Sequence, residues 1–109
     1  MPSDRPVQDT LAQMTAASIE NCELEAREFM LVRIAALAAS GAPAISYLAN
    51  AGTAADVGVT LEDVQDVLVA VAPIAGAPRT VLAAANIARA LGFAVAVAEA
   101  ELDAELDEE

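Results

Sequence analysis

A capped, two-faced segment in the middle of the chain constrains the fold more than any other feature. Thr60 can cap a helix whose third residue is Asp63, a variant of the capping box in which aspartate replaces the usual glutamate or glutamine. The apolar residues beyond this cap lie three and four positions apart, with acidic and amide side chains opposite them. The apolar set is Leu61, Val64, Val67, Leu68 and Val71. This period predicts a helix with one buried face and does not fit a strand.

Three further helices are expected before this one, at about residues 11–19, 24–40 and 43–58. Asp9 and Thr10 are available as early caps for the first of them. Acidic residues at the start of the second helix suit the positive end of its dipole, and a glycine at position 41 can end it. A proline suits the first turn of the third helix, and Gly58 can cap its end.

The helix expected at residues 24–40 is the best candidate for the core. Arg27 and Arg33 on its rim could reach acidic neighbours. Its apolar face is made of Phe29 or Met30 together with Ile34, Leu37 and Ala38.

Prolines and glycines interrupt the pattern after the central helix. Pro73, Gly76 and Pro78 predict a kink or a loop. Residues 81–91 are then expected to form a fifth helix that Gly92 ends.

The last segment allows two interpretations. Val95 and Val97 alternate with alanine, so a short strand is possible, but glutamate and alanine dominate from Glu99 onward and favour a sixth helix from residue 93 to about 106. Residues 99–109 contain seven acidic side chains and no basic one. Repulsion between these charges predicts that the end of the chain frays.

The expected fold class is all-α, a compact bundle of five to six helices. A length of 109 residues fits one domain and leaves no room for a second independent core. We expect a polar leader at residues 1–6, a single helical domain at 7–98 and an acidic tail at 99–109.

The composition predicts self-association. Hydrophobic residues make up 57% of the chain but aromatic residues only 3%, so alanine carries much of the apolar count. A small alanine-rich monomer buries little area per side chain, and the larger apolar residues are therefore expected to contact a partner subunit. These residues include Phe29, Met30, Ile45, Leu48 and Phe93.

Charge and cysteine usage narrow the function classes. A formal net charge of −12 repels phosphate backbones and anionic lipids, so neither nucleic acid nor a membrane is an expected partner. Cys22 is the single cysteine and there is no histidine, which excludes an internal disulfide and a zinc site of the Cys/His type. No signal-peptide core or transmembrane helix is recognised, and a cytoplasmic location is expected. No cofactor and no metal are expected.

Three sequence features occur in an order that resembles the carboxymuconolactone decarboxylase family, which includes alkylhydroperoxidase D. They are the apolar run at residues 31–38, the Gly58-Val59-Thr60 turn with Asp63 and Val67-Leu68 behind it, and the turn at residues 72–78. The similarity extends from about residue 28 to 90. It implies an all-helical, alkylhydroperoxidase D-like fold that assembles as a trimer or a hexamer.

The reactive residues that this resemblance would imply are missing. In the peroxidase branch, a Cys-x-x-Cys pair and a histidine would fall at Pro43, Ser46 and Asn50. In the decarboxylase branch, histidines would fall at Asn50 and Ala70. A chain with one cysteine and no histidine lacks both the thiol pair and the usual base near neutral pH, so both activities are disfavoured.

Polar residues at these positions could still line a pocket. Ser46 and Asn50 share one helix face, with Tyr47 adjacent, and could retain hydrogen-bonding groups there. The alternative is that they only fill an interior pocket or an interface, because buried polar groups usually serve to satisfy one another. A serine nucleophile would need a base, and none is evident.

A structural role is the alternative to a functional one for the arginines, for Cys22 and for Glu28. Arg33 interrupts an apolar run and should pair with a carboxylate, within its subunit or in a neighbouring one. Arg79, and Arg89 with Asn86, could face an anionic ligand, although structural pairing is favoured. Acidic neighbours weaken Cys22 as a nucleophile, so an incidental role is expected. Glu28 is explained by the helix dipole alone.

Two functional hypotheses follow. The favoured one is a non-catalytic, homo-oligomeric protein with a structural, interaction or ligand-binding role. The alternative is an enzyme of the same fold with a reworked site, a decarboxylase- or lyase-like protein acting on a small carboxylated or lactone substrate held by Arg79 or Arg33. An enclosed cavity where Ser46, Tyr47, Asn50 and an arginine converge would favour a ligand or a reaction.

Overall fold

The structure, a computed structural model, describes the backbone of residues 3–107 and the side chains in that range except those of residues 93–98 and 107. Five helices and no strands occur within it, which confirms the expected all-α fold. The helices are α1 (Pro6–Asn21), α2 (Ala26–Ser40), α3 (Ala44–Asp56), α4 (Leu61–Ala75) and α5 (Ala77–Asp107).

The central helix begins at the predicted cap. The Thr60 hydroxyl accepts a hydrogen bond from the Asp63 backbone N–H at 3.1 Å, and the Asp63 carboxylate accepts one from the Thr60 N–H at 2.8 Å. Both halves of a capping box are therefore formed. Gly41 ends α2 with a φ of 74°, a left-handed conformation that glycine adopts without strain.

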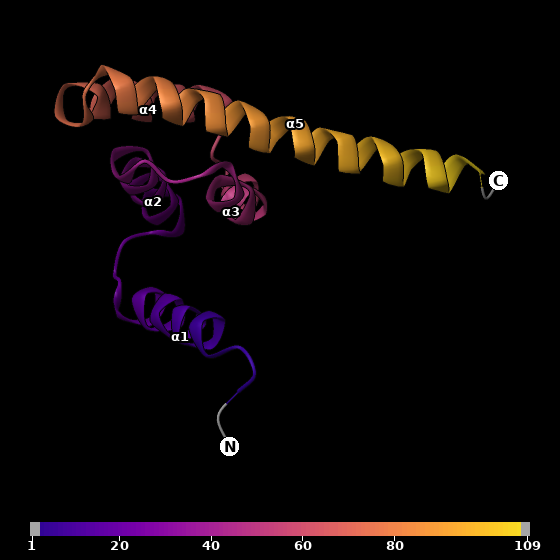
Figure 1. Cartoon of the computed structure of the whole chain (residues 1–109), viewed down its shortest axis with the longest axis horizontal. Coiled ribbons are helices and arrows are strands. Elements are labelled where there is room, and N and C mark those ends of the chain that lie inside the picture. The colour runs from indigo at the N-terminus through magenta and orange to yellow at the C-terminus, as the bar shows by residue number, and fades with distance from the viewer. Residues whose placement is uncertain (1–2, 108–109) are drawn as a thin grey trace.

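Helices α2 to α5 form the body of the molecule. In Figure 1, α2 and α3 lie on one side of the α4 and α5 pair; α2 packs against α4, and α3 against α5. Small residues at the centre let the helices approach closely, because alanine fills little space between them. The buried cluster is Ala38, Tyr47, Ala83, Ile87 and Ala90.

Polar side chains of α5 bind carbonyl groups in the last turn of α2 and just beyond it. Asn86 is buried and donates a hydrogen bond from Nδ2 to the Ala42 carbonyl at 3.1 Å. Arg89 donates to the Asn86 Oδ1 at 3.3 Å, and Arg79 donates to the Ala39 carbonyl at 2.6 Å. These contacts satisfy carbonyls that a helix end cannot pair internally, and they join α5 to α2.

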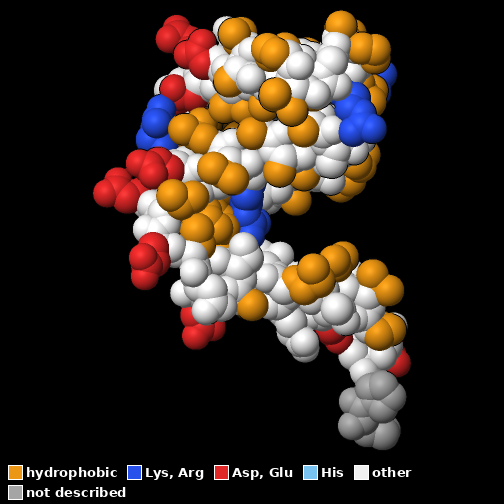
Figure 2. Space-filling view, turned by 90° about the vertical axis from the view of Figure 1, so that its left-hand side faces the viewer, with side chains coloured by type: hydrophobic (Ala, Val, Ile, Leu, Met, Phe, Trp, Pro, Cys, Tyr) orange, Lys and Arg blue, Asp and Glu red, His pale blue; other side chains and the backbone are white. Residues whose placement is uncertain are grey.

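Helix α1 stands apart from this body (Figures 1 and 2). It packs against none of the other helices that the structure describes, and all of its residues are exposed. It begins at Pro6, earlier than expected, so the prediction that Asp9 and Thr10 cap it is wrong. Proline suits the first position of a helix because its fixed φ is already helical, and Thr10 instead donates to the Pro6 carbonyl at 2.8 Å within the helix.

The predicted helix end at Gly92 is also wrong. Helix α5 continues from Ala77 to Asp107 without a break, so the expected fifth and sixth helices are one and the possible strand is not found. The predicted fraying concerns the very end of the chain, of which residues 108–109 lie outside the described part. Gly92 does not have a positive φ. A single glycine costs about 1 kcal/mol in a helix, and the surrounding alanines offset that cost.

The break between α4 and α5 occurs at one of the three predicted residues. Gly76 has a φ of 90° and separates the two helices, whereas Pro73 lies inside α4. Pro78 lies in the first turn of α5, where a missing N–H removes no helical hydrogen bond. None of the helices described here combines the length and the apolar content needed to cross a membrane.

Candidate functional site

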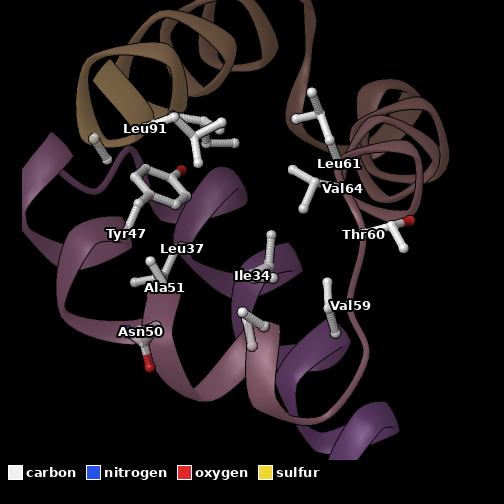
Figure 3. Close-up of a pocket in the computed structure, with 14 residues that line it drawn as sticks. Ile34, Leu37, Tyr47, Asn50, Ala51, Val59, Thr60, Leu61, Val64 and Leu91 are labelled. Atoms are coloured by element: carbon white, nitrogen blue, oxygen red, sulfur yellow. The ribbon is translucent and has the colours of Figure 1, made fainter. Parts of the chain in front are cut away.

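The four helices of the body surround a partly open apolar cavity of about 160 Å³ (Figure 3). Each helix contributes apolar side chains, and the α3–α4 loop closes one side. Its walls include Ile34, Leu37, Ala51, Val59, Val64 and Leu91. No charged side chain lines it among the described residues.

Tyr47 supplies a polar group to this cavity. Its side chain is 7% exposed, and its hydroxyl has no hydrogen-bond partner within the described part of the chain. Burial raises the pKa of this phenol above its usual value, so the group stays protonated and able to donate. Leaving a buried hydroxyl unpaired costs free energy, so an acceptor that reached this hydroxyl would be favoured.

The spacing of α3 explains which of its residues reach the cavity. Tyr47, Ala51 and Ala54 are separated by four and three positions and so share one helix face. Asn50 lies at the edge, and Figure 3 shows its side-chain oxygen turned away from the interior. Its Nδ2 donates to the Ser46 carbonyl at 2.7 Å, so the amide is satisfied within its own helix.

A second, open hollow of about 410 Å³ separates α1 from α2 and α3. Arg33 lines it, half-buried, with its guanidinium carbon 4.4 Å from the centre of the Phe29 ring. Arg33 pairs with no carboxylate among the described residues of its own chain, where a cation–π contact takes that place, and the expected pairing between subunits stays a prediction. Among the described residues the ion pair is Arg27 with Asp63, at 2.8 Å, as expected for Arg27.

The structure therefore brings together only part of the predicted candidate site. Tyr47 and Asn50 line the cavity, but Ser46 does not. Arg33 lies in the other hollow, which Asn50 also lines, and Arg79 lines neither, since it bonds to the end of α2. No arginine meets the polar residues of α3 in the described cavity.

Most residues that line the cavity were not predicted from the sequence to do so. Ile34 and Val64 were visible only as members of apolar stripes, assigned to a core without any sign of a gap, and Ile87 was not singled out. A signal for Tyr47 was present, because it is the single tyrosine of the chain and shares its helix face with two small alanines. Small residues beside a large one leave space when no other side chain fills it.

Comparison with protein families agrees with this architecture. The sequence model of the carboxymuconolactone decarboxylase family matches residues 5–90. The chain belongs to this family. Its helices accordingly form an alkylhydroperoxidase D-like fold. Comparison with curated proteins and with solved structures found no match.

The positions that the resemblance to the carboxymuconolactone decarboxylase family singled out are dispersed in this member. Pro43 is exposed and immediately precedes α3, and Ala70 is exposed on the outer face of α4. Asn50 alone among these positions lines the apolar cavity.

Proposed function

We propose that the protein is a non-catalytic, self-associating member of the carboxymuconolactone decarboxylase family that binds a small, uncharged, mostly apolar molecule. One observation carries the ligand proposal: the unpartnered Tyr47 hydroxyl is buried beside a cavity with no charged wall. A ligand with one hydrogen-bond acceptor would satisfy this hydroxyl while burying its apolar surface.

The size of the cavity sets the class of ligand. A dry, apolar cavity of about 150 Å³ in another protein accepts benzene, and the cavity beside Tyr47 measures about 160 Å³. A six-membered ring with one carbonyl oxygen, such as cyclohexanone or a small lactone, matches both the volume and the single donor.

The same walls argue against catalysis and against a carboxylated substrate. A carboxylate in this cavity would be an unpaired buried charge, which is costly. The chain has no histidine, and the described cavity has no carboxylate or amine to act as a general base. The alternative, an enzyme with a reworked site, would have to act on an uncharged lactone with Tyr47 as its only acid.

Calorimetric titration with cyclohexanone tests the ligand proposal. Wild-type protein should bind it, Tyr47→Phe should weaken binding by about two- to tenfold through loss of one hydrogen bond, and Ala51→Leu should abolish binding by filling the cavity. Ala84→Leu is a matched control, because Ala84 is exposed on α5 and outside the cavity. Equal binding by all four proteins would contradict the proposal.

Self-association is supported by the apolar side chains left on the surface. They include Val7, Leu11, Ile45, Val69, Ile74 and Val81, each more than half exposed. Such an excess on a small protein is typical of an interface. Light scattering should give the mass of a trimer or a larger species, and a stable monomer at micromolar concentration would contradict this. The lone cysteine supports a reducing, cytoplasmic location.

A further inference from the structure

The hollow beside α1 has an unusual charge for this protein. Its described lining contains one charged side chain, Arg33, and no carboxylate, although the whole chain carries a net charge of −12. The remaining lining is apolar or neutral and comes from three helices and the α1–α2 linker. It includes Ile19, Leu24, Phe29, Met30, Thr53 and Val57.

Helix α1, which forms one wall of the hollow, makes no packing contact with the other described helices that would hold it in place. Helix α1 has 16 residues, little more than the length of about 12–15 residues below which isolated helices are marginal in water. Val7, Leu11 and Met14 follow one another at four and three positions, and each is more than half exposed. Figure 2 shows apolar side chains along the upper edge of this arm, across the gap from the body. The arm therefore needs a surface that its own chain does not supply.

The C-terminal part of α5 is complementary to this hollow, because it carries exposed apolar side chains next to acidic ones. It projects beyond the other helices (Figure 1). Leu102 and Leu106 are one turn apart and more than half exposed. Glu99 and Glu105 lie three positions on either side of Leu102, so they flank this apolar stripe on the helix surface.

We propose that two copies of the chain associate by placing the C-terminal part of α5 from one copy in the hollow between α1 and the body of the other. Leu102 and Leu106 contact the apolar lining, and Glu99 or Glu105 pairs with Arg33. The proposal rests on the self-association proposed above and names its surfaces.

Charge complementarity selects a second copy as the occupant. Two chains of charge −12 repel over most of their surfaces. The hollow of one copy contains Arg33, which has no carboxylate beside it in the described lining. The end of α5 of the other copy carries Glu99 and Glu105 beside exposed leucines. Within one chain α5 makes no contact with α1, and its end points away from that helix in Figure 1. The carboxylates must therefore come from another copy.

A charge-reversal series followed by analytical ultracentrifugation tests this arrangement. Arg33→Glu should raise the dissociation constant about tenfold or more, since carboxylates would then face carboxylates. Adding Glu99→Lys with Glu105→Lys should restore association in that background. Glu62→Lys with Asp66→Lys makes the same change in net charge at exposed positions of α4 and should restore little.

Two controls distinguish a failure of this particular interface from a failure of self-association itself. Arg5→Glu changes the charge as Arg33→Glu does, but Arg5 lies outside the hollow, so this variant should associate like wild type. A wild-type monomer would overturn both this inference and the proposed self-association. An oligomer that Arg33→Glu leaves intact would overturn the arrangement alone. Circular dichroism confirms that each variant remains helical.

A cross-linking measurement gives an independent result. Cys22 is the native cysteine of the chain and lines the hollow. Leu102→Cys should therefore yield, on mild oxidation, a disulfide between Cys22 of one copy and the introduced cysteine of another, identified by mass spectrometry. Leu82→Cys, elsewhere on α5, should not link to Cys22. Equal linkage from both positions would contradict the arrangement.

Discussion

The properties of single residues decide what the cavity can do. Tyr47 brings an unpaired hydroxyl into an apolar space, whereas the amides of Asn50 and Asn86 are already bonded to backbone carbonyls. A paired group offers little to a ligand, and an unpaired one offers a hydrogen bond. The chemistry of the site is therefore that of one neutral donor.

Replacing Tyr47 by phenylalanine should not destabilise the ligand-free protein. Removal of a buried, unpartnered hydroxyl relieves a desolvation cost, so we expect the free energy of unfolding to rise by about 1 kcal/mol in urea titrations. Tyr47→Ala removes the ring as well and should cost about 3–5 kcal/mol through the cavity that it leaves. A loss of stability in the phenylalanine variant would show that the hydroxyl has a partner.

Asn86 should contribute more to stability than Asn50. Asn86→Ala leaves the Ala42 carbonyl and Arg89 without their partner in a buried place, and we expect a loss of about 2 kcal/mol. Asn50→Ala removes a bond within one helix turn and should change stability by less than about 0.5 kcal/mol. Chemical denaturation of the two variants makes the comparison, and equal losses would contradict it.

At the scale of elements, helix ends were predictable where a side chain or a glycine makes them. Thr60 with Asp63 and Gly41 mark their ends through local chemistry that neighbours in space do not alter. Gly92 looked similar, but a glycine ends a helix only when the chain turns there, and an alanine-rich sequence continues through it. The separation of α1 was not predictable, because periodicity shows an apolar face without showing what covers it.

The continuity of α5 predicts opposite effects for two glycines. Gly92→Ala should raise the free energy of unfolding by about 0.5–1 kcal/mol, because alanine is the better residue inside a helix. An added Cβ there would meet nothing within 4 Å. Gly41→Ala should lower stability instead, since Gly41 has a φ of 74° that alanine adopts only with strain. Thermal unfolding measures both; destabilisation by Gly92→Ala would indicate that the helix ends there.

The capping box gives α4 a dependence on pH. Hydrogen bonds from the Thr60 backbone N–H and hydroxyl, together with Arg27, hold the pKa of Asp63 below its usual value. The ionised carboxylate therefore stabilises the fold above the ordinary aspartate pKa of about 3.9, and this contribution is lost as the pH falls through the lower pKa of the folded state.

The thermal midpoint of wild-type protein should consequently fall more steeply than that of Asp63→Asn between pH 5 and the acid limit. Asp66→Asn removes an exposed carboxylate of the same helix that takes no part in the cap, and it should follow the wild-type curve. Parallel curves for wild type and Asp63→Asn would show that the cap does not titrate in this way.

At the scale of the whole molecule, the fold class and the family were accessible from the sequence, but the shape of the site was not. Stripes of apolar residues identified α2 and α4 as core helices, and the match over residues 5–90 agrees with them. The cavity depends on how four such stripes meet, which no single segment encodes. For the same reason Ser46, on the same segment as Tyr47, was predicted for the pocket and lies outside its walls.

The most direct test of a binding site without catalysis is a protein NMR titration with cyclohexanone and with a six-membered lactone, followed over many hours. Amide shifts should concentrate on the residues around the cavity, such as Ile34, Tyr47 and Ala90, while the spectrum of each small molecule stays unchanged. Shifts spread over the surface would contradict the cavity as the binding site. Conversion of the lactone that disappears in Tyr47→Phe would contradict the absence of catalysis.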